Sequence, residues 1–249
     1  MEQQKIQKFS IANLLILTLT IIVFATLIVL GTWQVNRLEW KENLLSQIDE
    51  RLKSQPVTID QIIENVKDEK AFEYQPVTVE GVFDHSKEQH FFATHQGRTG
   101  YYVYTPLSFE GGTVFINRGF VEFDLKNPEL RPQGQITGRV SVTGLARKML
   151  NEKPSSLVPD NDPVKNIFYW KDLILMAKMS ELTIADDQVQ PFFIDAVKSD
   201  IPGGYPIGGV TLIDLPNNHL SYAFTWYGLA ATLLVIAGVF LFRRKTLKA

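Results

Sequence analysis

The sequence contains no cysteine. This absence excludes disulfide bonds, thiolate metal sites, a CxxC redox motif and covalent c-type haem attachment. It also removes the usual ligands of a copper chaperone. A cysteine-free chain fits either side of a membrane, so this part of the composition leaves the compartment open.

Charge is missing from two long stretches, residues 9–36 and 215–242, which contain no Asp, Glu, Lys or Arg. Each includes an apolar core long enough to cross a bilayer, which takes roughly 20 helical residues. The sequence therefore predicts a transmembrane helix near each end. We expect the first to be a retained anchor, because its apolar run is too long for a signal peptide and it ends in Gly31-Thr32-Trp33-Gln34 without a small-x-small cleavage site.

The residues between these stretches, 37–214, are polar and of mixed character, and they are enough for one ordinary domain. Their net charge is −7, whereas the two ends together carry +5. An acidic domain without a basic face argues against nucleic acid as a partner.

Basic residues near the second stretch predict the orientation. Arg243, Arg244, Lys245 and Lys248 follow it, whereas Lys198 is the one basic residue in the approximately 20 residues before it. Cytoplasmic loops carry the excess of Lys and Arg, so both termini are expected in the cytoplasm. A bacterial inner membrane is favoured over a mitochondrial one. The predicted segments are a cytoplasmic N-terminus (1–10), a first span (11–33), a periplasmic mainly-β domain (34–218), a second span (219–242) and a cytoplasmic basic tail (243–249).

The first helix is expected to continue beyond the membrane surface. Trp33, Arg37, Trp40 and Leu44 recur at positions that share one helical face. One interpretation is an aromatic belt at the membrane interface, with Arg37 stacked on Trp33 or Trp40. The other is a face that docks a partner, a lipid or the acid group of a cofactor.

Alternating apolar and polar residues dominate the middle of the chain and predict strands. The pattern is typical of an antiparallel meander curled into a barrel-like sheet, so the fold class is membrane α+β: a two-helix transmembrane hairpin enclosing a mainly antiparallel domain with short helices. Expected strands are 74–83, 88–95, 101–107, 112–121, 139–146, 191–197 and 209–215; expected short helices are 59–70 and 170–182; expected loops are 151–166 and 201–209.

Known catalytic motifs are absent, and we expect a protein that is not an enzyme. His85, His90 and His95 are expected to be surface or turn residues, because the odd spacing of the last two places them on opposite faces of one strand. Asn117-Arg118-Gly119 reads as a polar strand end, suited to an anion or to a turn salt bridge.

His219 is the first residue of the predicted second span. An ionisable residue at the edge of a membrane is a candidate functional residue. Neutral imidazole is a good axial ligand for haem iron. Tyr222, Trp226 and Tyr227 follow on the same predicted helix and can pack on a planar ring. The alternative is an interfacial histidine within an aromatic belt.

Short motifs follow one another in order along nearly the whole chain. The first is Gly31-Thr-Trp-Gln34 with Arg37 and Trp40-Lys41. The others are Phe83-Asp-His-Ser-Lys-Glu88, Tyr101 with Val103 and Thr105-Pro106, Asn117-Arg-Gly-Phe-Val121, Phe193-Ile-Asp-Ala196, Pro202-Gly-Gly with Pro206-Ile-Gly-Gly209, and His219-Leu-Ser-Tyr222 with Thr225-Trp-Tyr-Gly228. Together they resemble the Surfeit locus protein family, known in yeast as Shy-one. The sequence departs from the family pattern at Glu122, where proline is common, at Tyr205, and at Lys171, where arginine is usual.

The resemblance implies an assembly factor for haem-copper terminal oxidases, chiefly cytochrome c oxidase. Bacterial members are described as binding haem a and aiding its delivery to the large catalytic subunit. The implied cofactor is thus haem a, transiently bound, with His219 as axial ligand to the iron and Trp33, Tyr222 and Trp226 beside the ring. Arg37 would pair with a haem propionate, since a guanidinium binds carboxylate as a fork.

The implied partners are oxidase subunit I, haem a synthase, other oxidase assembly factors and the lipid bilayer. A second hypothesis is a scaffold that binds no haem. It would hold nascent subunit I or haem a synthase through the faces of its spans, its sheet and the loop 201–209.

Overall fold

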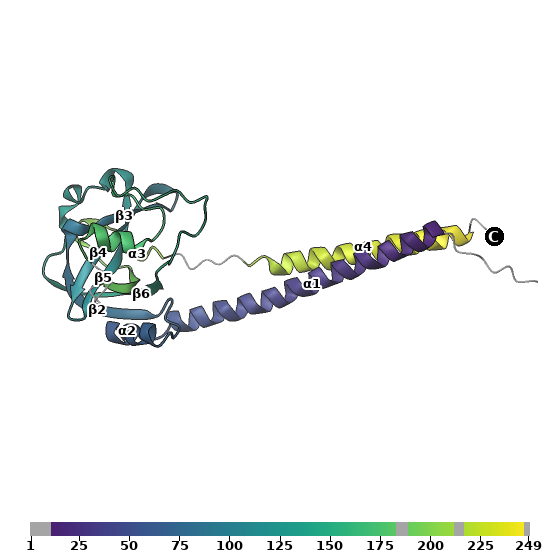
Figure 1. Ribbon diagram of the computed structural model, residues 1–249, viewed down its shortest axis with the longest axis horizontal. Helices are drawn as coiled ribbons and strands as arrows, with labels where there is room; N and C mark the ends of the chain where they lie inside the picture. Colours follow the sequence, from purple (N-terminus) through teal and green to yellow (C-terminus); the bar gives the residue numbers. More distant parts are fainter. Residues whose placement is uncertain (1–10, 183–188, 212–216, 247–249) are drawn as a thin grey trace, which may run out of the picture. The chain divides into compact units, whose positions relative to one another are not determined.

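The computed structural model describes residues 11–182, 189–211 and 217–246. The chain divides into two compact units. One combines Met1–Gln47 with Asp214–Ala249, and the other is Ile48–Ile213. Figure 1 shows the helices of the first unit and the sheet of the second.

Two long helices make up the described part of the first unit, α1 (Ile11–Leu52, 42 residues) and α4 (His219–Thr246, 28 residues). The last turn of α1, residues 48–52, belongs to the second unit. Both helices are long and apolar enough to cross a membrane. They lie side by side and run antiparallel (Figure 1), because Gln34 contacts His219 whereas Thr32, earlier in α1, contacts Tyr227, later in α4. Two such helices, at either end of a polar domain, confirm this part of the predicted fold and indicate a membrane protein.

The two helices meet along a stripe with coiled-coil spacing, which we call the helix seam. Buried and half-buried residues recur every three or four positions, as in helices that pack along one line. They include Thr20, Phe24, Leu27, Gly31, Gln34 and Leu38 on α1, and His219, Ala223, Trp226, Ala230, Leu233 and Ala237 on α4. The helices approach closely at Gly31, where a Cβ would lie 2.7 Å from the ring of Tyr227. Gln34 and His219 are therefore seam residues.

A seven-stranded sheet forms most of the second unit, in the order β1-β2-β6-β7-β5-β4-β3. A second pairing, between β2 and β4, curls it into the predicted barrel-like form. The strands are β1 (Val57–Thr58), β2 (Pro76–Phe83), β3 (Gln89–His95), β4 (Arg98–Phe109), β5 (Gly112–Glu122), β6 (Arg139–Lys148) and β7 (Val189–Ala196); the short helices are α2 (Ile59–Lys67) and α3 (Leu173–Met179).

The central strands are buried on both faces, which explains their nearly continuous apolar sequence. Ile116 of β5 and Ile194 of β7 point into a cluster that includes residues of α2. Phe115 and Phe193, one position earlier in each strand, point to the opposite face and pack with residues of α3. This period-2 alternation gives the domain two apolar clusters, one on each side of the central strands.

Most predicted strands match the observed ones to within three residues at either end. The simple meander was wrong, because β5 pairs with β7 in parallel and β2 lies next to β6. Alternation identifies a strand but not its neighbour. The predicted helix 170–182 is shorter, since Asp172 caps it by accepting from Leu175 N. Of the predicted strand 209–215, residues 209–211 are not in a strand and residues 212–216 lie outside the described residues.

Candidate functional site

A polar contact in the helix seam includes His219, the residue predicted to be a haem ligand. His219 is half-buried and is the first residue of α4. Its Nδ1 lies 2.7 Å from Oε1 of Gln34 on α1. An amide oxygen can only accept, so His219 Nδ1 is the donor. The Nε2 nitrogen then keeps its lone pair, as an imidazole needs in order to ligate a metal.

The aromatic residues predicted to accompany His219 divide between two environments. Trp226, two turns along α4, is a half-buried seam residue on the same stripe as His219. Trp33 and Tyr222 are each 55% exposed and face away from the seam. The structure thus gathers His219 and Trp226 on one stripe and leaves Trp33 and Tyr222 on outer surfaces of the helices.

Arg37 lies on α1 one turn beyond Gln34 and is exposed. Its guanidinium carbon lies 3.8 Å from the centre of the Trp40 ring. Of the two stacking partners that were predicted, Trp33 and Trp40, the structure therefore shows Trp40. Stacking uses the flat face of a guanidinium and leaves its N–H edge directed outward. That edge is the part suited to a carboxylate.

The residues around His219 include side chains of the kinds that a haem site uses. Among the residues that the structure describes, no three His, Cys, Asp or Glu side chains gather as ligands of a metal ion. A haem brings four ring nitrogens of its own and needs only an axial ligand from the protein. The imidazole of His219 suits that role, and Trp226 lies on the same stripe, whereas Trp33 and Tyr222 lie on outer surfaces of the helices.

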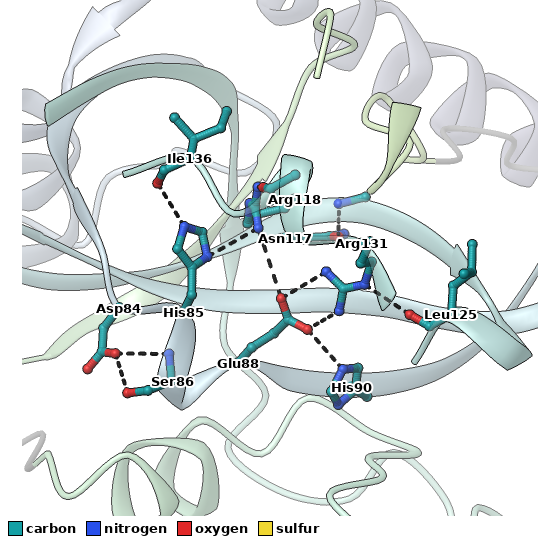
Figure 2. A network of polar contacts seen from close by, with 12 residues as sticks. Asp84, His85, Ser86, Glu88, His90, Asn117, Arg118, Leu125, Arg131 and Ile136 are labelled. Atoms are coloured by element: carbon teal, nitrogen blue, oxygen red, sulfur yellow. Dashed lines mark hydrogen bonds and ion pairs between the residues drawn. The ribbon is translucent and has the colours of Figure 1, made fainter. Parts of the chain in front are cut away.

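A second cluster of polar residues is buried within the sheet domain (Figure 2). Glu88, just before β3, accepts hydrogen bonds from Arg131, with Arg131 Nη1 at 3.1 Å and Nη2 also in contact. His90 Nε2 donates to the same carboxylate at 3.0 Å, and Arg118 Nη1 of β5 lies 3.9 Å from it. All four side chains are almost completely buried. One carboxylate therefore lies among two guanidinium groups and an imidazole.

His85 extends this network to the turns after β5. Its Nε2 donates to the Ile136 carbonyl at 2.8 Å, so its Nδ1 can accept from Arg118 Nη1 at 3.4 Å. Arg118 also donates through Nη2 to the Gly134 carbonyl. The segment that follows β5 is thus held against β5 and the start of β3 by buried polar contacts (Figure 2).

The electrostatics of this network suit a charged carboxylate and a neutral His85. Burial alone would raise the pKa of Glu88, but the hydrogen bonds from His90 and Arg131 and the charge of Arg131 lower it overall. Burial lowers the pKa of Arg118 to about 10, against the opposing effect of Glu88. Burial also lowers the pKa of His85, and the charge of Arg118 adds to that effect.

These contacts correct one expectation and decide another. His90 was expected to be a surface or turn residue, but its side chain is buried in strand β3, where its Nε2 donates to Glu88. Arg118 was open to two interpretations, an anion site or a salt bridge, and the structure shows an internal ionic contact. The motifs around His85 and Arg118 therefore meet in one place and hold the fold.

A third polar cluster surrounds Asp195 of β7. Arg147 Nη1 lies 2.9 Å from Asp195 Oδ2, and Thr211 Oγ1 donates to the same oxygen at 3.0 Å. Arg147 also pairs with Glu73 at 2.8 Å, and the Glu73 carbonyl accepts from Arg51 in the last turn of α1. Within the second unit, Arg51 and Thr211 are thus both joined to this polar cluster.

The loop 201–209, proposed as a working surface in the scaffold hypothesis, is docked on β5. Phe120 and Ile207 exchange backbone hydrogen bonds of 2.9 and 2.8 Å. Gly119 permits this approach, because a Cβ there would lie 2.0 Å from the Ile207 carbonyl oxygen. Tyr205 adds a side-chain hydrogen bond to Glu122 at 3.2 Å.

Sequence reasoning missed Gln34 as a site residue, although a signal was present. An amide side chain near the end of the charge-free stretch 9–36 is unusual enough to suggest a polar partner on another helix. Glu88 and Arg131 were also missed as partners, because 43 residues separate them and neither stands out in its own segment.

Comparison with known proteins decides the family. The model of the SURF1 family matches residues 21–231. The chain belongs to the SURF1 family. Surfeit locus protein 1 of Rattus norvegicus is 40% identical over 225 residues, which cover 83% of this chain and 69% of the relative. Surfeit locus protein 1 of Homo sapiens is 38% identical over 221 residues, which cover 81% of this chain and 69% of the relative. A SURF1-like protein of Monosiga brevicollis is 33% identical over 227 residues, which cover 87% of this chain and 83% of the relative.

The SURF1 match includes both the helix seam and the sheet domain. His219 and Gln34 lie within the matched residues, as do Glu88, Arg118 and Arg131. The predicted resemblance is confirmed at the level of the family, and it extends over both units of the chain.

Proposed function

We propose that this SURF1-family protein is an assembly factor for a haem-copper terminal oxidase, cytochrome c oxidase in particular, and that it binds haem a on the way to subunit I. It performs no catalysis of its own. The observation that carries the proposal is the contact between His219 Nδ1 and Gln34 Oε1, which leaves Nε2 as the nitrogen able to ligate iron.

The proposed roles of the surrounding residues follow from their positions. His219 would ligate the haem iron. Trp226, half-buried on the same stripe, would contact the ring, and the exposed Trp33 and Tyr222 would shield it from the surroundings. The outward N–H edge of Arg37 pairs with a propionate. The bound haem would be the cargo that is delivered to subunit I, and the residues of this protein would hold it and shield it until then.

The proposed setting is a bacterial inner membrane with both termini in the cytoplasm and the sheet domain in the periplasm. Support comes from Arg243, Arg244 and Lys245, which follow the second apolar stretch directly. His219 begins α4, so this orientation places it at the periplasmic end of the second span. Subunit I and haem a synthase are the proposed partners at that surface.

A scaffold that binds no haem is the second candidate, and an exposed aromatic patch on the sheet domain favours it. Phe123 is 57% exposed and stacks on Tyr101 at 5.7 Å between ring centres. Phe92 is 39% exposed and packs against Tyr169 at 5.8 Å. Exposed aromatic side chains held by one another are suited to contact with another protein.

One experiment separates the two candidates. The protein is purified in mild detergent from cells that make haem a and from cells in which haem a synthesis is blocked. A haem-handling factor carries a Soret absorption band in the first preparation. A scaffold carries no pigment in either preparation and retains subunit I in both, and that result would replace the first candidate with the second.

A further inference from the structure

Gln34 determines which nitrogen of His219 can bind a metal. The 2.7 Å contact joins Nδ1 to an oxygen that cannot donate, so the hydrogen resides on Nδ1. A neutral imidazole carries one hydrogen, and Nε2 is therefore left as the acceptor. Reversal of the tautomer would require the Gln34 amide to turn and offer its NH2 group to Nδ1 in place of the oxygen that lies there.

The surroundings of Gln34 keep its side chain in this arrangement. Gln34 is 8% exposed, with its side chain packed in the helix seam. One turn away, Gly31 lets the Tyr227 ring approach α1, and Thr32 Oγ1 lies 3.2 Å from the Tyr227 hydroxyl. These contacts fix the two helices next to the His219 contact. An amide in such a place has little water to turn to, so the imidazole is its main polar partner.

We propose that Gln34 is a positioning residue, which fixes the tautomer and the direction of the His219 ring so that Nε2 is presented to a haem iron. The inference rests on the proposed haem function and adds to it a residue that does not touch the iron. Metal-binding histidines commonly donate their second ring nitrogen to a carbonyl or carboxylate, which orients the ring and raises its basicity. Here the acceptor comes from the other helix, so the ligand is oriented only when the hairpin is assembled.

The first test uses the protein without haem and reads the tautomer directly. Histidine labelled with ¹⁵N is incorporated, and the His219 signals are identified by their loss in His219→Ala. We expect a protonated Nδ1 and an unprotonated Nε2 in the parent, and a loss of that preference in Gln34→Leu. Thr32→Val is the matched control, because it removes the neighbouring interhelical hydrogen bond without touching His219; it should keep the parent tautomer.

The second test measures haem a binding by titration of the same proteins in mild detergent. Gln34→Leu should bind about 10- to 100-fold more weakly than the parent, the usual cost of losing such a partner, whereas Thr32→Val should bind normally. Gln34→Glu keeps an acceptor for Nδ1 and adds a negative charge beside the ligand. It should retain haem and shift the reduction potential to more negative values, which a merely structural contact would not do.

The outcomes separate this inference from the proposed function. A parent protein that binds haem while His219 carries its hydrogen on Nε2 would overturn the role of Gln34 alone. The same holds if Gln34→Leu binds haem as well as Thr32→Val does. A parent protein that takes up no haem would overturn the proposed function and, with it, the ligand-presenting role, whatever the tautomer.

Discussion

Tyr205 and Glu122 contact each other: the Tyr205 hydroxyl donates to Glu122 Oε1 at 3.2 Å. Both are positions at which the sequence was expected to depart from the family pattern. The contact joins the loop 201–209 to the end of β5, where Glu122 also pairs with Arg98 at 2.5 Å. The two departures are therefore coupled in the structure and together fasten the loop.

A double-mutant cycle measures that coupling. Tyr205→Phe and Glu122→Ala should each destabilise the sheet domain slightly, and the double variant should lose less than the sum. We expect a coupling of about 0.5–1.5 kcal/mol, the usual net value of one hydrogen bond, from urea unfolding curves. Strict additivity would show that the two side chains act independently.

The second prediction concerns the carboxylate at the centre of the buried network. Glu88→Gln leaves the guanidinium groups of Arg118 and Arg131 buried without a counter-charge, and removal of one partner from such a group costs about 3–5 kcal/mol. Urea unfolding in mild detergent checks this value. The control is Glu80→Gln, which breaks the surface pair with Arg139 at 3.5 Å and should change stability little. Equal small losses in both variants would contradict the assigned importance of Glu88.

Stability should also depend on the protonation of His85. In the folded state, burial lowers the pKa of His85. The hydrogen bond to the Ile136 carbonyl raises the pKa, and the charge of Arg118 lowers it further. Below about pH 6.5 the ring of His85 takes up a proton more readily in the unfolded chain than in the folded chain. The contribution of neutral His85 to folding stability is therefore fully present above that pH and decreases as the pH falls below it.

The check compares unfolding at about pH 7.5 and about pH 5.5 in the parent and in His85→Asn. The parent should lose more stability on acidification than the variant, because the variant lacks the titrating ring. Identical losses would mean that other groups account for the acid sensitivity.

Much of the fold could be predicted because its signals are local. Alternation marked the strands of the sheet, and two uncharged stretches marked α1 and α4. The helix seam was not predicted, since a span that is apolar on every side hides the spacing of residues such as Ala223 and Ala230. Only the packed structure shows which face of each helix is covered.

The polar contacts could be predicted less well, because they join residues far apart in the chain. His219 stood out as a titratable residue at the end of an apolar stretch, whereas its partner Gln34 lies 185 positions away. Arg131 lies in turns with no periodic pattern, so nothing in its neighbourhood indicates that Glu88 is its partner. The residue types were visible, but their pairing depends on tertiary packing.

Membrane topology gives a fourth prediction. A reporter that is active only in the periplasm should be active when fused after Asn151 and silent when fused after Ala249. Replacement of Arg243, Arg244 and Lys245 by Gln should weaken this orientation, because cytoplasmic Lys and Arg set it. Periplasmic activity of the Ala249 fusion, or silence of the Asn151 fusion, would reverse the proposed sidedness.

The haem a content of His219→Ala, compared with the parent, tests the central claim most directly. Both proteins are purified in mild detergent from cells that make haem a, beside His95→Ala, in which a histidine of the sheet domain is removed instead. The parent and His95→Ala should carry haem a with a Soret band, and His219→Ala should lose most of it. An unchanged Soret spectrum and haem content in His219→Ala would contradict the account.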